Sequence, residues 1–314
     1  MILARALMLT LALTMPAAHA ELRVLVVSGL GGEPDYEKRF QQQASAVAAA
    51  AARAGAKKDD IALLSGERAR KDALEDALTS LATRAQKNDQ VLVVLIGHGA
   101  YDGEDYRFNL PGPDMTGREI GAWLDKLQAG QQLVVNATSA SGAVIESWKR
   151  PNRIVITATK SGTERNATRF AEYWVQALSS AEADRDKNDT VTAAEAFEFA
   201  ARKVADAFKS DAALATEHAR MEGGNGGNFL VARLGESAVL PDDPALAALV
   251  AEQTGLEQQI EQLKGRKPAL ERAQYYDELE KVLLTLAKLD RRIDERRATL
   301  TGTTARENNA PRAR

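Results

Sequence analysis

Short apolar segments alternate with amphipathic stretches between residues 22 and 235, and this alternation constrains the fold more than any other feature. The apolar segments are rich in valine, isoleucine and leucine, as strands buried on both faces of a sheet are. They cover Leu22–Val27, Ile61–Leu64, Val91–Ile96, Leu133–Val135 and Arg153–Thr157. Helical patterns lie between them, including 69–86 and 116–128. This β-α-β-α order predicts an α/β domain with a mainly parallel sheet and helices on both faces.

Distinctive polar turns follow three of these predicted strands. The turns are Gly97-His98-Gly99, Asn136–Gly142 and Thr157–Arg165. Ligands and chemistry collect at the carboxyl ends of the strands in such sheets. We therefore expect His98 and the small hydroxyl residue Ser139 to lie on neighbouring strand ends, in the layout of a base and a nucleophile.

These turns carry a resemblance to a known group, the caspase-like superfamily, and within it the legumain-type cysteine peptidases. In that family one apolar strand ends in His-Gly and a second ends in Ala-Cys-x-Ser-Gly. The matching segments here are 94–99, which ends in His98-Gly99, and 138–142, which reads Thr-Ser-Ala-Ser-Gly. The resemblance covers residues 22 to 235 and implies a caspase-like three-layer αβα sandwich. It implies catalytic positions at His98, Ser139 and Gly99, and a substrate-cleft wall at Thr157, Ala158 and Thr159.

The chain departs from this family at the nucleophile, because it contains no cysteine and Ser139 occupies the matching position. A hydroxyl needs a well-oriented base and an oxyanion hole to become a nucleophile. We therefore expect a catalytically silent peptidase fold that binds a peptide or a protein partner. The alternative is an active hydrolase that uses Ser139, with His98 as general base and the N–H groups of Gly99 and Ser139 as oxyanion donors. A purely structural scaffold stabilised by calcium is a third interpretation.

Composition narrows the other function classes. The formal net charge of −3 does not favour nucleic acid as a partner. Only three histidines are present, His19, His98 and His218, which argues against a multi-histidine metal site. We interpret His218 as a structural residue. The glycines at 29, 31 and 32 fail as a dinucleotide-binding fingerprint because Pro34 stands at the third glycine position.

A twelve-residue acidic segment, 184–195, resembles the calcium loop of an EF-hand. Oxygen ligands are expected from six of its residues: Asp184, Asp186, Asn188, Thr190, Thr192 and Glu195. The departure from the pattern is Asp189, which stands where an EF-hand has glycine. The alternative interpretation is a capping box, Thr192–Glu195, that starts a helix after an acidic turn. Both readings are compatible, since the exit of such a loop is a helix start.

The first twenty residues read as a cleaved secretory signal peptide. A positive charge at Arg5 precedes the apolar run 6–15, and small residues follow in Pro16-Ala-Ala-His-Ala20. This run is too short to span a bilayer. The expected location of the mature chain is therefore the periplasm or the outside of a bacterial cell.

The last quarter of the chain has a different pattern, which predicts a domain boundary near residue 240. Asp243 and Pro244 form a helix start, and apolar residues then recur at alternating three- and four-residue steps in two stripes. These stripes predict a helical hairpin or coiled coil over 241–300, with dimerisation through the same seams as the competing interpretation. Residues 301–314 are polar, and we expect them to be disordered.

Overall fold

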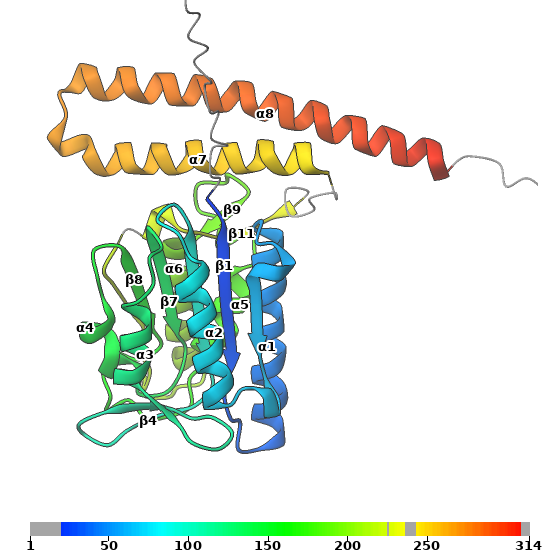
Figure 1. The fold of residues 1–314 in the computed structure, drawn as a ribbon. Coiled ribbons are helices and arrows are strands. Elements are labelled where there is room, and N and C mark those ends of the chain that lie inside the picture. The colour runs from blue at the N-terminus through cyan, green and yellow to red at the C-terminus, as the bar shows by residue number, and fades with distance from the viewer. Residues whose placement is uncertain (1–19, 225, 236–242, 309–314) are drawn as a thin grey trace, which may run out of the picture.

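A six-stranded sheet forms the centre of the computed structural model, which describes residues 20–224, 226–235 and 243–308 (Figure 1). Its strand order is β10-β8-β7-β3-β1-β2. Five strands run parallel, and β10 pairs antiparallel with β8 at one edge. The strands are β1 (Leu22–Ser28), β2 (Ile61–Leu64), β3 (Gln90–Ile96), β7 (Gln131–Asn136), β8 (Arg153–Thr157) and β10 (Arg220–Glu222). The prediction of an α/β domain with a mainly parallel sheet is confirmed.

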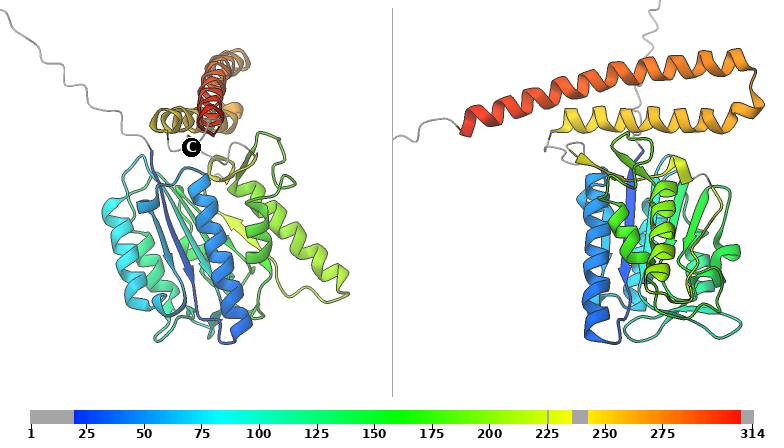
Figure 2. Two further views of the ribbon diagram at one scale, coloured as in Figure 1. Left: turned by 90° about the vertical axis from the view of Figure 1, so that its right-hand side faces the viewer. Right: turned by 180° about the vertical axis from the view of Figure 1, so that it is seen from behind.

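Helices cover both faces of the sheet, because successive side chains of each buried strand point to opposite faces. One face, with Val24 and Val26, packs against α1 (Pro34–Arg53), α5 (Phe170–Ala177) and α6 (Ala193–Ser210). The other face, with Leu25 and Val27, packs against α2 (Lys71–Arg84), α3 (Gly117–Leu124) and α4 (Ile145–Trp148). Figure 2 shows the helices on either side of the sheet. The domain therefore has three layers.

Smaller elements lie at the two ends of the central sheet. A three-stranded excursion follows His98 directly and consists of β4 (Gly99–Tyr101), β5 (Tyr106–Phe108) and β6 (Met115–Thr116). A two-stranded sheet pairs β9 (Thr190–Thr192) with β11 (Leu230–Arg233). Short 3-10 helices occupy Lys58–Asp60, Gly66–Arg68, Ser141–Val144, Gly226–Asn228 and Lys267–Ala269. The sequence pattern predicted neither β9 nor β10.

A buried ion-pair network fixes the amino ends of the strands. The guanidinium of Arg23 contacts Asp60 at 2.6 Å and Asp89 at 2.9 Å, and all three side chains are buried. Buried charges of this kind are tolerated only when they are paired and hydrogen-bonded. The charged side chains at the amino ends of the strands are therefore paired with one another. The polar turns after the strands lie at the opposite, carboxyl edge.

The C-terminal region forms two long helices, α7 (Pro244–Arg266) and α8 (Arg272–Asn308), that pack antiparallel to each other. Asp243 caps α7 by accepting a hydrogen bond from the Leu246 N–H at 2.7 Å, as the sequence predicts. The carboxylate of Asp243 also binds Arg296 of α8, and Gln253 donates to Asp290 at 2.8 Å. Figure 1 shows this hairpin across the end of the sheet where β9 and β11 lie.

The two terminal segments of the chain are only partly described by the structure. Helix α8 continues to Asn308 and so includes 301–308, and the disorder expected over 301–314 stays a prediction. Helix propagation adds a hydrogen bond for each residue fixed, so a polar segment can continue an existing helix. Residues 1–19 of the predicted signal peptide (1–20) and residues 309–314 of the predicted tail lie outside the described residues. Within the described part of the chain, no helix is both long enough and apolar enough to cross a membrane.

Candidate functional site

The turns after β1, β3, β7 and β8 meet at the carboxyl edge of the sheet. Hydrogen bonds continue the sheet just past the strand ends: Gly29 N–H donates to the Ile96 carbonyl at 2.8 Å, and Ala137 N–H donates to the Leu95 carbonyl at 2.9 Å. Ala158 N–H donates to the Asn136 carbonyl at 3.0 Å. The parallel register thus brings together the His98 turn, the Ser139 turn and the segment 157–159, as the sequence analysis expects.

Gly99 shows how closely the His98 and Ser139 turns pack. A Cβ atom at position 99 would lie 2.4 Å from the Ser139 carbonyl oxygen and 2.7 Å from the Thr138 hydroxyl oxygen. Only glycine permits this approach. The main chains of the two turns are therefore in direct contact.

The imidazole of His98 packs against aromatic rings of helix α1. Its centroid lies 4.9 Å from that of Tyr36 and 5.1 Å from that of Phe40, both in edge-on arrangements. Burial lowers the pKa of His98, and the positive charge of Arg39 acts in the same direction, whereas the Gly31 main chain and Glu33 oppose the shift. Among the described residues, no hydrogen bond joins the His98 ring to the Ser139 hydroxyl. The imidazole thus packs against α1 and also interacts with the Gly31 main chain, which precedes this helix.

Ser139 lies in a buried and strained turn. The residue is 2% exposed. The next residue, Ala140, has a φ of 56°, in the left-handed region that non-glycine residues rarely adopt. A hydrogen bond of 2.8 Å from the Ala140 N–H to the Glu164 carbonyl holds this conformation. Strain of this kind persists only where the surroundings impose it, and it is frequent at binding and catalytic sites.

A buried polar layer supports the Ser139 turn. The hydroxyls of Tyr106 and Thr138 lie 2.7 Å apart, and Thr138 donates to the Asn136 side-chain oxygen at 2.8 Å. Burial raises the pKa of Tyr106, so its phenol stays protonated. The buried hydroxyl of Ser28 and the side-chain nitrogen of Asn136 have no hydrogen-bond partner within the described structure. Buried polar groups are usually paired, so these two atoms at the carboxyl edge are exceptions that call for a functional reason.

The predicted cleft wall, Thr157, Ala158 and Thr159, is buried. The Thr159 hydroxyl accepts the Gly142 N–H at 2.9 Å, and the Thr159 N–H donates to the Ser141 hydroxyl at 3.2 Å. The segment therefore fixes the second half of the Ser139 turn. Direct contact of these three residues with a substrate stays a prediction.

The structure also places His218 near this edge, which the sequence did not indicate. Its ring Nδ1 hydrogen-bonds to the Glu164 carboxylate, whose main-chain carbonyl binds Ala140. Glu164 also accepts the Lys160 N–H at 2.9 Å. The signal was absent because β10, which follows His218 and pairs with β8, is too short and too charged to read as a strand.

Away from this edge, the acidic loop brings three of its six predicted ligands together. Carboxylate oxygens of Asp184, Asp186 and Glu195 all lie within 4.8 Å of one another. Burial raises the pKa of Asp186, and the negative charges of Glu195 and Asp184 add to that rise. Carboxylates crowded in this way repel one another unless a cation or a proton neutralises them. The described residues thus form a site that a metal ion would fit.

The remaining predicted ligands have other partners in the loop. The Asn188 side-chain oxygen accepts the Thr190 N–H at 2.9 Å, and Thr192 caps helix α6 through a capping box with Glu195. The capping-box interpretation is therefore confirmed for the exit of the segment, and the calcium-loop interpretation stays a prediction. Asp189 has a φ of 61°, the left-handed conformation that glycine usually supplies at this position of an EF-hand loop. The hydrogen bond from its N–H to Asp184, 2.9 Å long, holds the turn.

A buried carboxylate, Glu217, gives a prediction for pH dependence. It is 5% exposed and accepts the N–H groups of Arg169 and Phe170, each at 2.8 Å, where α5 begins. Burial raises its pKa to about 7, against the pull of those two hydrogen bonds. The folded state thus holds this proton more tightly than the unfolded chain does. Its stabilising contribution is complete below the unfolded pKa and is lost as pH rises to about 7.

We expect the free energy of unfolding to fall by roughly 3 kcal/mol between pH 4.5 and pH 7 through this group. The change Glu217→Gln should flatten that slope, while Glu172→Gln, an exposed glutamate on α5, should leave it unchanged. Urea unfolding followed at several pH values measures both. An equal slope in wild type and Glu217→Gln would contradict the assignment.

Comparison with known proteins adds little to this geometry. No protein-family profile matches the sequence, and no curated protein does. Among solved structures, the chain is similar to protein GSU0716 from Geobacter sulfurreducens, with 12% sequence identity and a TM-score of 0.45. That similarity covers 65% of this chain and 94% of the other.

Proposed function

We propose that this protein is an exported, caspase-like peptidase fold of the legumain type that is catalytically silent and binds a peptide or protein segment. The binding site is the carboxyl edge of the sheet. Two observations support the fold assignment: helices cover both sheet faces, and the segments that end in His98-Gly99 and contain Ser139 lie at the ends of paired strands.

One observation carries the choice of binding over catalysis. The His98 ring packs edge-on against Tyr36 and Phe40 and makes no hydrogen bond to Ser139. A general base must reach the proton that it removes, and a serine depends on that base far more than a thiol does. The serine hydrolase that uses Ser139 and His98 is the rival function, and the strained Ala140 conformation is the observation in its favour.

The edge has features suited to a ligand. Leu30, directly after β1, is 42% exposed, and its N–H donates to the Asn109 carbonyl at 2.9 Å. The Ser28 hydroxyl, two residues earlier, is buried and has no partner within the described structure. An apolar anchor beside a few polar groups is the usual composition of a binding site. A bound peptide would cover this leucine.

The test is selection of binding peptides from a random library displayed on phage, with the mature chain as target. We expect the selected peptides to bind Leu30→Ser about tenfold more weakly, because they lose an apolar contact. The matched control is Leu283→Ser on the hairpin, where the leucine is 46% exposed; this variant should bind as the wild type does. Failure to select any peptide, or equal loss in both variants, would contradict the proposed site.

We further propose calcium as the ion of the acidic loop. Asp184, Asp186 and Glu195 supply carboxylates, and Asn188, Thr192 and the Thr190 carbonyl complete an all-oxygen set, which hard cations such as Ca²⁺ prefer. The left-handed Asp189 supports an EF-hand-like loop. Bound calcium would neutralise the crowded carboxylates and stabilise the start of α6. An affinity in the millimolar to submillimolar range suits a protein outside the cytoplasm.

Calcium at 10 mM should raise the free energy of unfolding by about 1.4–2.7 kcal/mol if the Kd lies between 10⁻³ and 10⁻⁴ M. Differential scanning calorimetry measures the corresponding rise in Tm. The increment should disappear in Asp186→Asn and persist in Asp206→Asn, an exposed control on α6. An unchanged wild-type Tm would refute the site, and a similar rise with magnesium would refute the choice of calcium.

A further inference from the structure

Strand β11 connects the acidic loop with the helical hairpin, because it pairs with the loop and lines the same cavity as both hairpin helices. Strand β9, which forms positions 7 to 9 of the loop, pairs with β11, and Thr190 lies opposite Arg233. The Leu234 N–H donates to the Asp189 carbonyl at 2.8 Å. The main chain of the loop is therefore paired directly with the segment that carries Arg233.

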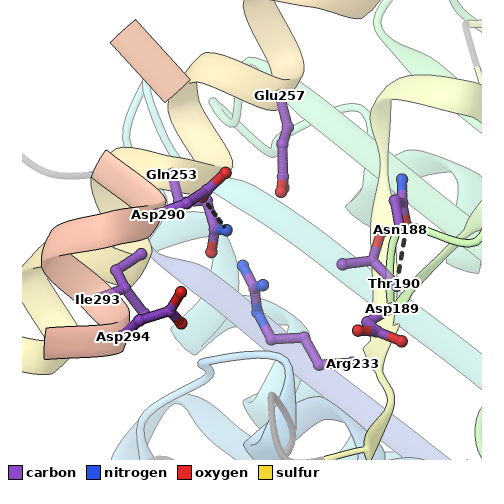
Figure 3. Close-up of a pocket in the computed structure, with 9 residues that line it drawn as sticks. All are labelled: Asn188, Asp189, Thr190, Arg233, Gln253, Glu257, Asp290, Ile293 and Asp294. Carbon is purple, nitrogen blue, oxygen red and sulfur yellow. Dashed lines mark hydrogen bonds between the residues drawn. The ribbon is translucent and has the colours of Figure 1, made fainter. Parts of the chain in front are cut away.

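A cavity of about 190 Å³ separates the loop from the hairpin. Its walls come from the loop, from β11 and from both hairpin helices (Figure 3). In this view Glu257 of α7 and Arg233 of β11 point toward each other, and Asp290 of α8 lies beside Gln253. The contact between the hairpin and the domain is thus polar and incompletely packed.

Negative charge is in excess around this cavity. Four of its nine lining residues are acidic, Asp189, Glu257, Asp290 and Asp294, and one, Arg233, is basic. The crowded ligand carboxylates of the loop lie close to Asp189, since its N–H donates to one of them, Asp184. Such charges repel one another strongly where water is partly excluded.

Glu257 of α7 lies on the hairpin side of this cavity. Burial raises the pKa of Glu257; Arg233 opposes that rise, and the charge of Asp290 adds to it.

From these contacts we propose that a divalent cation in the 184–195 loop controls the docking of the α7–α8 hairpin on the α/β domain. The proposal rests on the proposed cation site. With the ion bound, the negative charge of the loop is offset, and the acidic hairpin side chains that line the cavity are accepted beside it. Without the ion, the repulsion across the cavity favours an undocked hairpin. Coupling between two such sites is reciprocal, so a docked hairpin also raises the affinity for the cation.

The test exploits the absence of cysteine from the chain. Spin labels on Asp206→Cys in α6 and Glu280→Cys in α8, both exposed positions, report the distance between domain and hairpin by pulsed electron resonance. We expect one narrow distance population with calcium and an additional broad population in EGTA. Calcium should also increase the hydrogen-exchange protection of α7 amides by about fivefold or more.

The variant Glu257→Gln, which removes a negative charge from the hairpin, distinguishes the effect of calcium on hairpin docking from the binding of calcium itself. It should show the narrow population with and without calcium, while titration calorimetry still detects calcium binding. Glu271→Gln, an exposed glutamate before α8, should behave as the wild type does. If calorimetry detects binding but the distances do not change, the coupling is refuted and the cation site stands. If calorimetry detects no calcium binding, the cation site fails and the coupling fails with it.

Discussion

Parallel pairing of β1, β3, β7 and β8 is the constraint on which the rest of this molecule depends. It requires a helical crossover between successive strands, which covers both faces and makes the sheet the buried centre. It also puts every strand's carboxyl end at one edge. The amino edge is occupied by the buried pairs of Arg23 with Asp60 and Asp89. The turns that carry His98 and Ser139 consequently meet at the opposite edge.

At that edge the backbone arrangement and the side-chain arrangement point to different outcomes. The backbone has the close packing and strain that are frequent at functional sites, with Gly99 packed on the Ser139 carbonyl and Ala140 in a left-handed conformation. The His98 imidazole packs edge-on against aromatic rings of α1, and no hydrogen bond joins it to the Ser139 hydroxyl among the described residues. The binding function that we propose rests on this combination. The acidic loop and the hairpin lie at the other end of the sheet, where we propose that a cation couples them.

Local patterns predicted most of the fold: β2 and β8 have the bounds that their apolar runs indicated. The pattern missed β10, because a three-residue charged strand depends on its antiparallel partner for stability. The same limit applies to the site. Strand order was enough to bring the His98 and Ser139 turns together, but the ring packing of Tyr36 comes from a distant helix. Likewise, the ligand spacing identified the acidic loop, whereas its contact with the hairpin arises only from tertiary packing.

In the proposed function Ser139 has no working base, and labelling with a fluorophosphonate probe tests this. The probe forms a covalent bond only with a serine whose hydroxyl is activated. Intact-mass and peptide analysis of the mature protein would locate any label, with Ser139→Ala and Ser161→Ala as matched variants. We expect no label at Ser139 in folded wild-type protein. Stoichiometric labelling of Ser139 that is lost in Ser139→Ala and kept in Ser161→Ala would contradict it.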